Sequence, residues 1–292
     1  MRRVRVMTIG QNATAAKAVL LAAAVLATPA QAWAGPADTY YERAFVVAAD
    51  ARCDLFAPQV DAALTAAMAQ ARGAALRSGA AEADLNAVVA RARSRAAAVS
   101  CRDPQLATVR ARVDGAFSGW TRTPRMTFAG ERQHWVADRT KWARPGWRLM
   151  QASTVGASSV TFGYGGKADA SALTAVVSFV GRSRPNAARI VFRDDAKAPR
   201  AWLAGGGLAP ASTRASVWAT GVSAADPGLL AEGRRAGEAW RFPASAADRL
   251  ARLDPRETFL VEFHFRDGSV ATARFEAGDF AAGRAFMGMG AL

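Results

Sequence analysis

The spacing of apolar residues divides the chain into a helical part and a strand part. Between residues 38 and 120 apolar side chains recur every three or four positions, which places them on one face of a helix. From about Met126 the apolar positions begin to alternate, and Gly, Trp, Val, Phe and Thr become frequent, as is typical of strands. The chain therefore predicts an α+β fold, in which an all-α helical module, residues 33–122, precedes a mostly antiparallel β domain, residues 123–292.

The predicted elements follow from these two patterns. The helices run over Thr39–Ala51, from Pro58 to the Ser78-Gly79 pair, over Leu85–Val99, and from Pro104, with Asp103 as its cap, to Trp120. The strands are Arg132–Ala137, Trp147–Ser153, Ser159–Tyr164, Leu173–Val180, Arg189–Arg193, Ser216–Val222, Glu238–Phe242, Thr258–Arg266 and Ser269–Glu276. The Asp267-Gly268 turn closes the last two strands into a C-terminal hairpin, and short helices are expected at Ser245–Leu253 and Phe280–Met289. Strands in such a series favour a sandwich or a barrel-like domain.

The first 32 residues carry the three parts of a secretory signal peptide. A basic start without acidic residues is followed by an apolar run from Ala18 to Ala27 and by small residues at Ala30 and Ala32. A run of about 10 apolar residues is too short to cross a bilayer, which needs roughly 20. We therefore expect export to the periplasm or the medium, cleavage after Ala32 or Ala34, and a mature chain without a transmembrane segment.

The basic residues of the expected mature chain are unevenly spread. Residues 123–200 hold 13 basic and 5 acidic side chains, so most of the excess positive charge lies in this stretch. Such an excess favours anionic partners. Arg outnumbers Lys 34 to 4, and a bias in codon composition is therefore an alternative source of the charge.

The two cysteines of the chain, Cys53 and Cys101, lie at the ends of the first and third predicted helices. In an oxidising compartment a lone pair of this kind predicts a disulfide bond. Closing a loop of about 49 residues stabilises a fold by roughly 4 kcal/mol on the chain-entropy model. A redox or metal-binding pair is the alternative, but the spacing is not that of a redox motif and two thiols alone make a poor zinc site.

Two groups of residues resemble an uncharacterised group of exported bacterial proteins. The first comprises Arg-Cys-Asp-Leu-Phe at residues 52–56, Cys101, Phe117–Trp120 and Met126-Thr127-Phe128. The second extends from Asp254-Pro255-Arg256-Glu257 to Gly278-Asp279-Phe280. The resemblance implies a similar architecture over most of the mature chain, and it implies no activity.

Catalytic motifs give little support for an enzyme. No Gly-x-Ser-x-Gly motif is present, and the glycine-rich Gly163–Lys167 lacks the spacing of a phosphate-binding loop. His264 and Glu262 lie two residues apart in a predicted strand and so share one face. A periplasmic hydrolase that uses these two residues, with His134 as a third, is the alternative function. A catalytic zinc commonly needs three protein ligands, and neither a metal nor a cofactor is expected here.

A stretch between Trp135 and Arg148 is the strongest binding candidate. Three tryptophans alternate with four basic residues: Trp135, Arg139, Lys141, Trp142, Arg144, Trp147 and Arg148. Aromatic faces stack on sugars or cations, and guanidinium groups suit carboxylates and phosphates. The first hypothesis is therefore a non-enzymatic envelope protein that binds an anionic envelope polymer or another envelope protein. Nucleic acid is not an expected partner in the periplasm.

Overall fold

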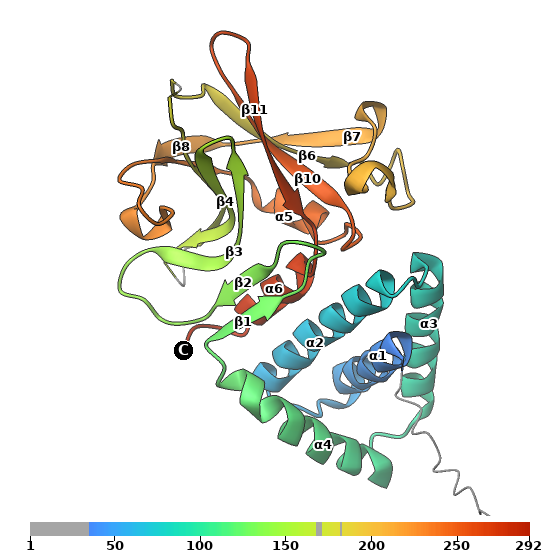
Figure 1. Ribbon diagram of the computed structural model, residues 1–292. Helices are drawn as coiled ribbons and strands as arrows, with labels where there is room; N and C mark the ends of the chain where they lie inside the picture. Colours follow the sequence, from blue (N-terminus) through green and yellow to red (C-terminus); the bar gives the residue numbers. More distant parts are fainter. Residues whose placement is uncertain (1–34, 168–170, 182) are drawn as a thin grey trace, which may run out of the picture. The chain divides into compact units, whose positions relative to one another are not determined.

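A computed structural model describes residues 35–167, 171–181 and 183–292 (Figure 1). The predicted signal peptide and its two cleavage sites lie outside these residues. Helices come first in the described chain and strands follow, with one short α-helix before the last two strands and another after them. The predicted α+β class, with an N-terminal helical module and an antiparallel β domain, is confirmed.

The helical module consists of α1 (Pro36–Cys53), α2 (Pro58–Arg77), α3 (Glu82–Ala98) and α4 (Pro104–Thr121). All four predicted helices are present. Proline begins α2 and α4, where its missing N–H has no intrahelical partner to lose. The Asp103 carboxylate caps α4 by accepting a hydrogen bond of 2.8 Å from the Gln105 backbone N–H. Helix α1 packs against both α2 and α3, and α2 also contacts α4. No helix of the described residues is long and apolar enough to span a membrane.

A disulfide bond joins Cys53 to Cys101, as the sequence predicts. Cys53 is the last residue of α1, and Cys101 lies between α3 and α4. The bond therefore ties the end of the first helix to the connection between the third and the fourth. The turn that follows Cys53 and leads into α2 is fixed by Asp50, whose carboxylate accepts hydrogen bonds from the Leu55 and Phe56 backbone N–H groups.

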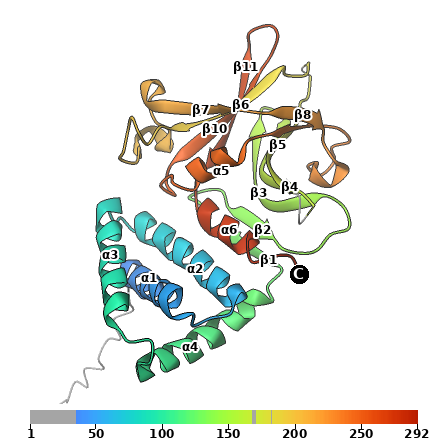
Figure 2. The same ribbon diagram turned by 180° about the vertical axis from the view of Figure 1, so that it is seen from behind.

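The β domain contains two antiparallel sheets (Figures 1 and 2). The seven-stranded sheet has the order β1-β2-β3-β4-β5-β9-β8, and the four-stranded sheet has the order β11-β10-β6-β7. The strands are β1 (Arg125–Phe128), β2 (Trp135–Asp138), β3 (Gly146–Val155), β4 (Ser158–Gly166), β5 (Ala172–Ser178), β6 (Ala187–Arg193), β7 (Arg214–Trp218), β8 (Gly221–Ala224), β9 (Glu238–Arg241), β10 (Thr258–His264) and β11 (Val270–Glu276). Neither sheet closes on itself, so the domain has the packed sheets of a sandwich and not a barrel.

The core lies between the two sheets and continues under helix α6 (Phe280–Met287). Phe162 of β4 contacts Phe259 of β10 and Phe275 of β11, with ring centroids 5.2 and 5.5 Å apart. Helix α6 packs on β1, β2 and β3 with one side and on α2 with another. Helix α5 (Ala244–Leu250) adds Ala246, Ala247 and Leu250 to the same core. Residues of the helical module and of the β domain therefore belong to one hydrophobic cluster, and a second cluster around Tyr40, Leu76 and Leu85 lies within the helical module.

Two predictions about strands need correction. The predicted strand Ser216–Val222 is two strands, β7 and β8, which belong to different sheets. The chain changes sheets within two residues, because the Ala219 N–H donates to Ala188 O of β6 and the Thr220 N–H donates to Arg241 O of β9. Strand β1 is not among the predicted strands. The hairpin of β10 and β11 around Asp267-Gly268 is confirmed, with Gly268 at a φ of 80°.

Candidate functional site

The candidate site is a cavity of about 540 Å³ on the outer face of the seven-stranded sheet, the face turned away from the core. Strands β1, β2 and β3, the loop between β2 and β3, and the short helix η3 (Pro227–Leu229) form its walls. The lining residues are Arg125, Val136, Asp138, Trp142, Ala143, Arg144, Pro145, Gly146, Trp147, Met150 and Gly228. Apolar side chains dominate this lining, and the volume lies within the range of small-molecule sites.

The floor of the cavity follows from strand register. Val136 of β2 and Met150 of β3 are cross-strand partners, so their side chains lie beside each other on the outer face. Asp138, two residues after Val136, shares this face. Arg125 at the start of β1 is the cross-strand partner of Asp138. Antiparallel pairing thus places two charged groups at one end of an apolar floor.

A β-bulge in β3 turns Trp147 toward the cavity. Trp147 pairs with Gly165 and Leu149 pairs with the preceding residue of β4, Tyr164, so Arg148 is the extra residue. Strict alternation would put Trp147 on the same face as the buried Leu149, whereas the extra residue moves it to the outer face. There its indole N–H donates to Leu229 O at 3.1 Å. This bond attaches η3 to the strand and completes one wall.

The loop between β2 and β3 is held by Arg139, of which 2% is exposed. Its Nε donates to Gly290 O at 2.7 Å, its Nη1 donates to Trp120 O at 3.2 Å, and its guanidinium lies over the Phe286 ring. Burial lowers the pKa of Arg139 from its ordinary value. These contacts join the loop to the end of α4 and to the last residues of the chain.

A second buried arginine supports the loop from the strand side. Arg148 donates a hydrogen bond from Nη1 to Thr140 O. The Thr140 N–H donates to the Asp138 carboxylate at 2.8 Å, and the Lys141 N–H donates to Leu292 O at 2.8 Å. The beginning of the loop is therefore fixed through both its carbonyl and its amide groups. Trp142, which follows it, is 54% exposed.

The structure corrects three of the seven residues predicted to form a binding surface. Trp135, Arg139 and Arg148 are buried and cannot belong to an exposed face. Trp135 lies in the core, where its indole N–H donates to Ala277 O at 2.9 Å. Of the other four, Trp142, Arg144 and Trp147 line the cavity, and Lys141 is exposed in the same loop.

The charge of the cavity is unevenly balanced. Arg125 and Arg144 are both exposed, and neither guanidinium makes a hydrogen bond or an ion pair with a described residue. The described part of the lining contains a single carboxylate, Asp138, which already accepts a hydrogen bond from the Thr140 N–H. Within the described lining, two guanidinium groups without a partner among the described residues stand against one engaged carboxylate, and this balance of charge favours an anionic ligand.

Sequence reasoning missed five lining residues that matter for this geometry: Arg125, Val136, Asp138, Met150 and Gly228. The alternation of Val136 and Asp138 after Trp135 is a signal that could have found the outer face of β2. Arg125 carried no such signal, because β1 was not predicted. Gly228 belongs to η3, which lies more than 60 residues after β3 in the sequence, so no local pattern could predict that it lines the cavity.

The alternative hydrolase site is only partly assembled. His264 and Glu262 do lie together on the outer face of the four-stranded sheet, with Nε2 and Oε2 3.5 Å apart. The Glu262 carboxylate, however, accepts a hydrogen bond of 2.7 Å from Arg189 Nε, and the Trp218 ring lies 5.1 Å from the His264 ring. The carboxylate is therefore engaged in an ion pair on a sheet surface.

His134 does not reach this pair. It follows Gln133, whose N–H donates to Glu276 at the end of β11, and Glu276 pairs with Thr258 at the start of β10. His264 lies six residues further along β10, which corresponds to about 20 Å at the rise of a strand. Among the described residues no group of three His, Cys, Asp or Glu side chains is arranged to hold a metal ion.

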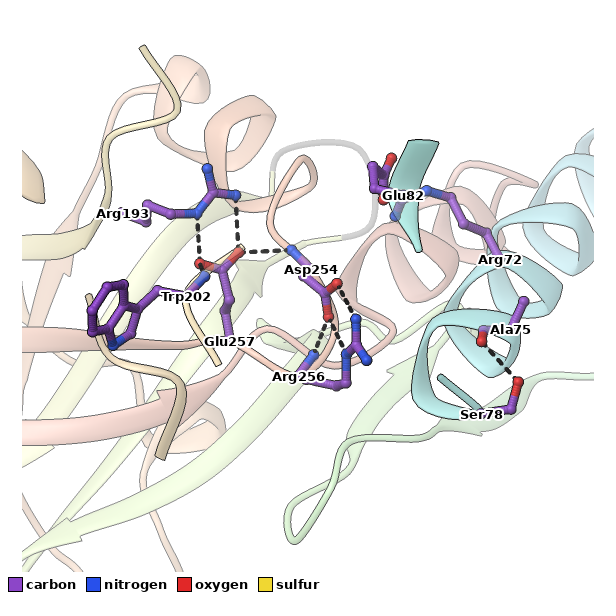
Figure 3. A network of polar contacts seen from close by, with 9 residues as sticks. All are labelled: Arg72, Ala75, Ser78, Glu82, Arg193, Trp202, Asp254, Arg256 and Glu257. Atoms are coloured by element: carbon purple, nitrogen blue, oxygen red, sulfur yellow. Dashed lines mark hydrogen bonds and ion pairs between the residues drawn. The ribbon is translucent and has the colours of Figure 1, made fainter. Parts of the chain in front are cut away.

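A second cavity, of about 960 Å³, lies between helices α2 and α3 and the segments around Asp195 and Asp254. The carboxylates in and beside its lining are ion-paired: Glu257 with Arg193 and Asp254 with Arg256 (Figure 3), and Glu82 with Arg72. The exposed Arg200 of the lining has no partner among the described residues. The remaining described carboxylate of the lining, Asp195, is paired with Arg252. This network holds the segments together, and each described carboxylate of the lining is engaged in an ion pair.

A scan against protein-family models, a search of curated proteins and a search of solved structures each found no match.

Proposed function

We propose that this chain is an exported, non-enzymatic binding protein of the cell envelope, and that the cavity over β1, β2 and β3 binds part of an anionic envelope polymer. One observation carries the proposal: a largely apolar cavity has two guanidinium groups, of Arg125 and Arg144, without a partner among the described residues. Arginine forms paired hydrogen bonds with carboxylates and phosphates. The indole faces of Trp142 and Trp147 offer flat apolar surfaces to a sugar ring.

Two features support export. The first 32 residues have the composition of a secretory signal peptide. The Cys53–Cys101 disulfide supports the same compartment, because disulfides persist in oxidising surroundings such as the periplasm and are rare in the bacterial cytoplasm.

The hydrolase hypothesis has less support. A general base must be able to take a proton, whereas the Glu262 carboxylate is ion-paired with Arg189. Neither His264 nor Glu262 lies in the lining of the cavity at β1, β2 and β3. The binding hypothesis instead uses residues that the structure brings together around a concave site.

The test compares retention of the purified protein on insoluble cell-wall material. The variant pair Arg125→Ser and Arg144→Ser removes both guanidinium groups from the cavity and is expected to lower retention about tenfold, because two charged contacts of roughly 0.7 kcal/mol each at an exposed site add to about 1.4 kcal/mol. The control pair Arg91→Ser and Arg112→Ser removes two exposed arginines of the helical module that have no partner among the described residues.

The control pair keeps the net charge equal to that of the cavity pair, so a general effect of charge would weaken both proteins alike. Retention that is equal in both variants, or equal to that of the unchanged protein, contradicts the proposal. Specific capture of an envelope protein with no affinity for the polymer would also contradict it and favour a protein partner.

A further inference from the structure

We infer, on the basis of the proposed function, that the group entering the cavity is an amphipathic anion: an apolar body with a single carboxylate, phosphate or sulfonate group. Shape gives the first reason. The cavity of about 540 Å³ is large enough for a compact organic group, and its floor and walls are apolar at Val136, Met150, Pro145 and Trp147. The apolar part of such a ligand has no polar group that would lose its hydrogen bonds to water on the floor of the cavity. A polymer with a charge on every repeat unit would instead place charged groups against apolar side chains, which is unfavourable.

The position of the charges gives the second reason. Arg125 stands at the start of the edge strand β1, and Arg144 lies in the loop between β2 and β3. Both are exposed, whereas Val136 and Met150 of the floor are half-buried. A ligand with its apolar part on the floor therefore meets positive charge at the exposed margin. Asp138 lies opposite Arg125 across the strands and disfavours a second negative group on the floor.

The walls of the cavity are fixed before any ligand binds. The Trp147 indole is anchored to Leu229 O, and the loop is anchored through the buried Arg148. Gly228 of η3 packs so closely on the loop that a Cβ atom there would lie 2.2 Å from Pro145 O. Binding of a ligand of fitting shape therefore carries only a small entropic cost of ordering the protein, and this favours selective binding of a small group.

The experiment uses two fluorescent dyes that differ mainly in charge. Anilinonaphthalene sulfonate is an apolar aromatic body with one anionic group, and phenylnaphthylamine is the corresponding uncharged molecule. Titration of the folded protein is expected to give saturable binding of both, with the sulfonate bound more tightly. The pair Arg125→Gln and Arg144→Gln is expected to weaken sulfonate binding about tenfold and to leave the uncharged dye unchanged.

Two further variants locate the site. Met150→Trp places a large ring on the floor and is expected to weaken both dyes, while the pair Arg91→Gln and Arg112→Gln in the helical module is expected to weaken neither. Circular dichroism of each variant establishes that it is folded. The inference is overturned if both dyes respond equally to the loss of Arg125 and Arg144, if Met150→Trp leaves both unaffected, or if neither dye binds saturably. Each of these results concerns small probes, so retention on cell-wall material tests the proposed function separately.

Discussion

The carboxylate of Glu257 is the most informative position for testing how the fold is held together. Its side chain is 1% exposed and accepts hydrogen bonds from Arg193 Nε at 2.6 Å and Arg193 Nη2 at 2.9 Å. It also accepts bonds from the backbone N–H groups of Asp254, at 2.9 Å, and Trp202, at 3.2 Å (Figure 3). One side chain thus joins β6, the loop around Trp202 and the turn before β10.

The substitution Glu257→Gln keeps the shape of the side chain and removes its charge. One oxygen of the carboxylate becomes an NH₂ group, which faces donors and cannot accept their hydrogen bonds. The Arg193 guanidinium, whose side chain is 6% exposed, then lacks its counter-ion. Breaking a buried ion pair from one side costs about 3–5 kcal/mol, which is a large part of the roughly 5–15 kcal/mol that stabilises a typical domain.

Urea unfolding followed by circular dichroism measures this cost, and thermal unfolding should show a decrease in Tm of about 10 °C. The matched control is Glu232→Gln, at an exposed glutamate without a partner among the described residues. We expect the control to change the free energy of unfolding by less than about 0.5 kcal/mol. A loss at Glu257 below about 1 kcal/mol, or a loss equal to that of the control, would refute the reasoning.

Two other predictions concern the contact between helices and the acid stability of the fold. Gly73→Ala in α2 should destabilise the protein by about 1–2 kcal/mol in urea unfolding, because its Cβ would lie 1.8 Å from an oxygen of the Asp279 carboxylate. Gly115→Ala in α4, where a Cβ would meet no described atom outside its own helix within 4 Å, should instead stabilise it by up to about 1 kcal/mol through helix propensity. Equal effects at the two glycines would exclude the packing explanation. Burial raises the pKa of Asp254, but the hydrogen bonds and charge of Arg256 outweigh it and lower this pKa below its ordinary value. A carboxyl with a lowered pKa stabilises the fold above its unfolded pKa of about 3.9 and loses this effect as the pH falls through the folded pKa. Asp254→Asn should therefore destabilise at pH 7 and reduce the loss of stability between about pH 4 and pH 2; an unchanged pH profile would contradict the assignment.

The helical module could be predicted from the sequence because the signals that define it are local. The cap at Asp103 and the first-turn prolines Pro104 and Pro58 act within a few residues, and the spacing of apolar residues within one helix shows which of its faces is buried. Strands depend on partners that are distant in the sequence. Between Trp218 and Gly221 the chain passes from one sheet to the other, because β7 pairs with β6 and β8 pairs with β9. The sequence of that segment contains no pattern that predicts this change.

The candidate site shows the same limit. The interleaved tryptophans and basic residues include Trp142 and Arg144, which line the cavity, but composition could not separate the residues that face the cavity from those that face the core. Arg139 looks like a surface residue in the sequence and is instead surrounded by backbone carbonyls. The position of Trp147 depends on the bulge at Arg148, which is a property of the pairing between β3 and β4.

The loop between β2 and β3 separates residues that hold its backbone from residues that line the cavity. Arg139 and Arg148 are buried and hold the backbone of the loop, whereas the side chains from Trp142 to Arg144 are exposed. On the proposed function, we expect substitutions in that short segment to alter ligand preference with little loss of stability. A variant that keeps the two buried arginines is therefore expected to keep the backbone of the loop while its exposed segment changes.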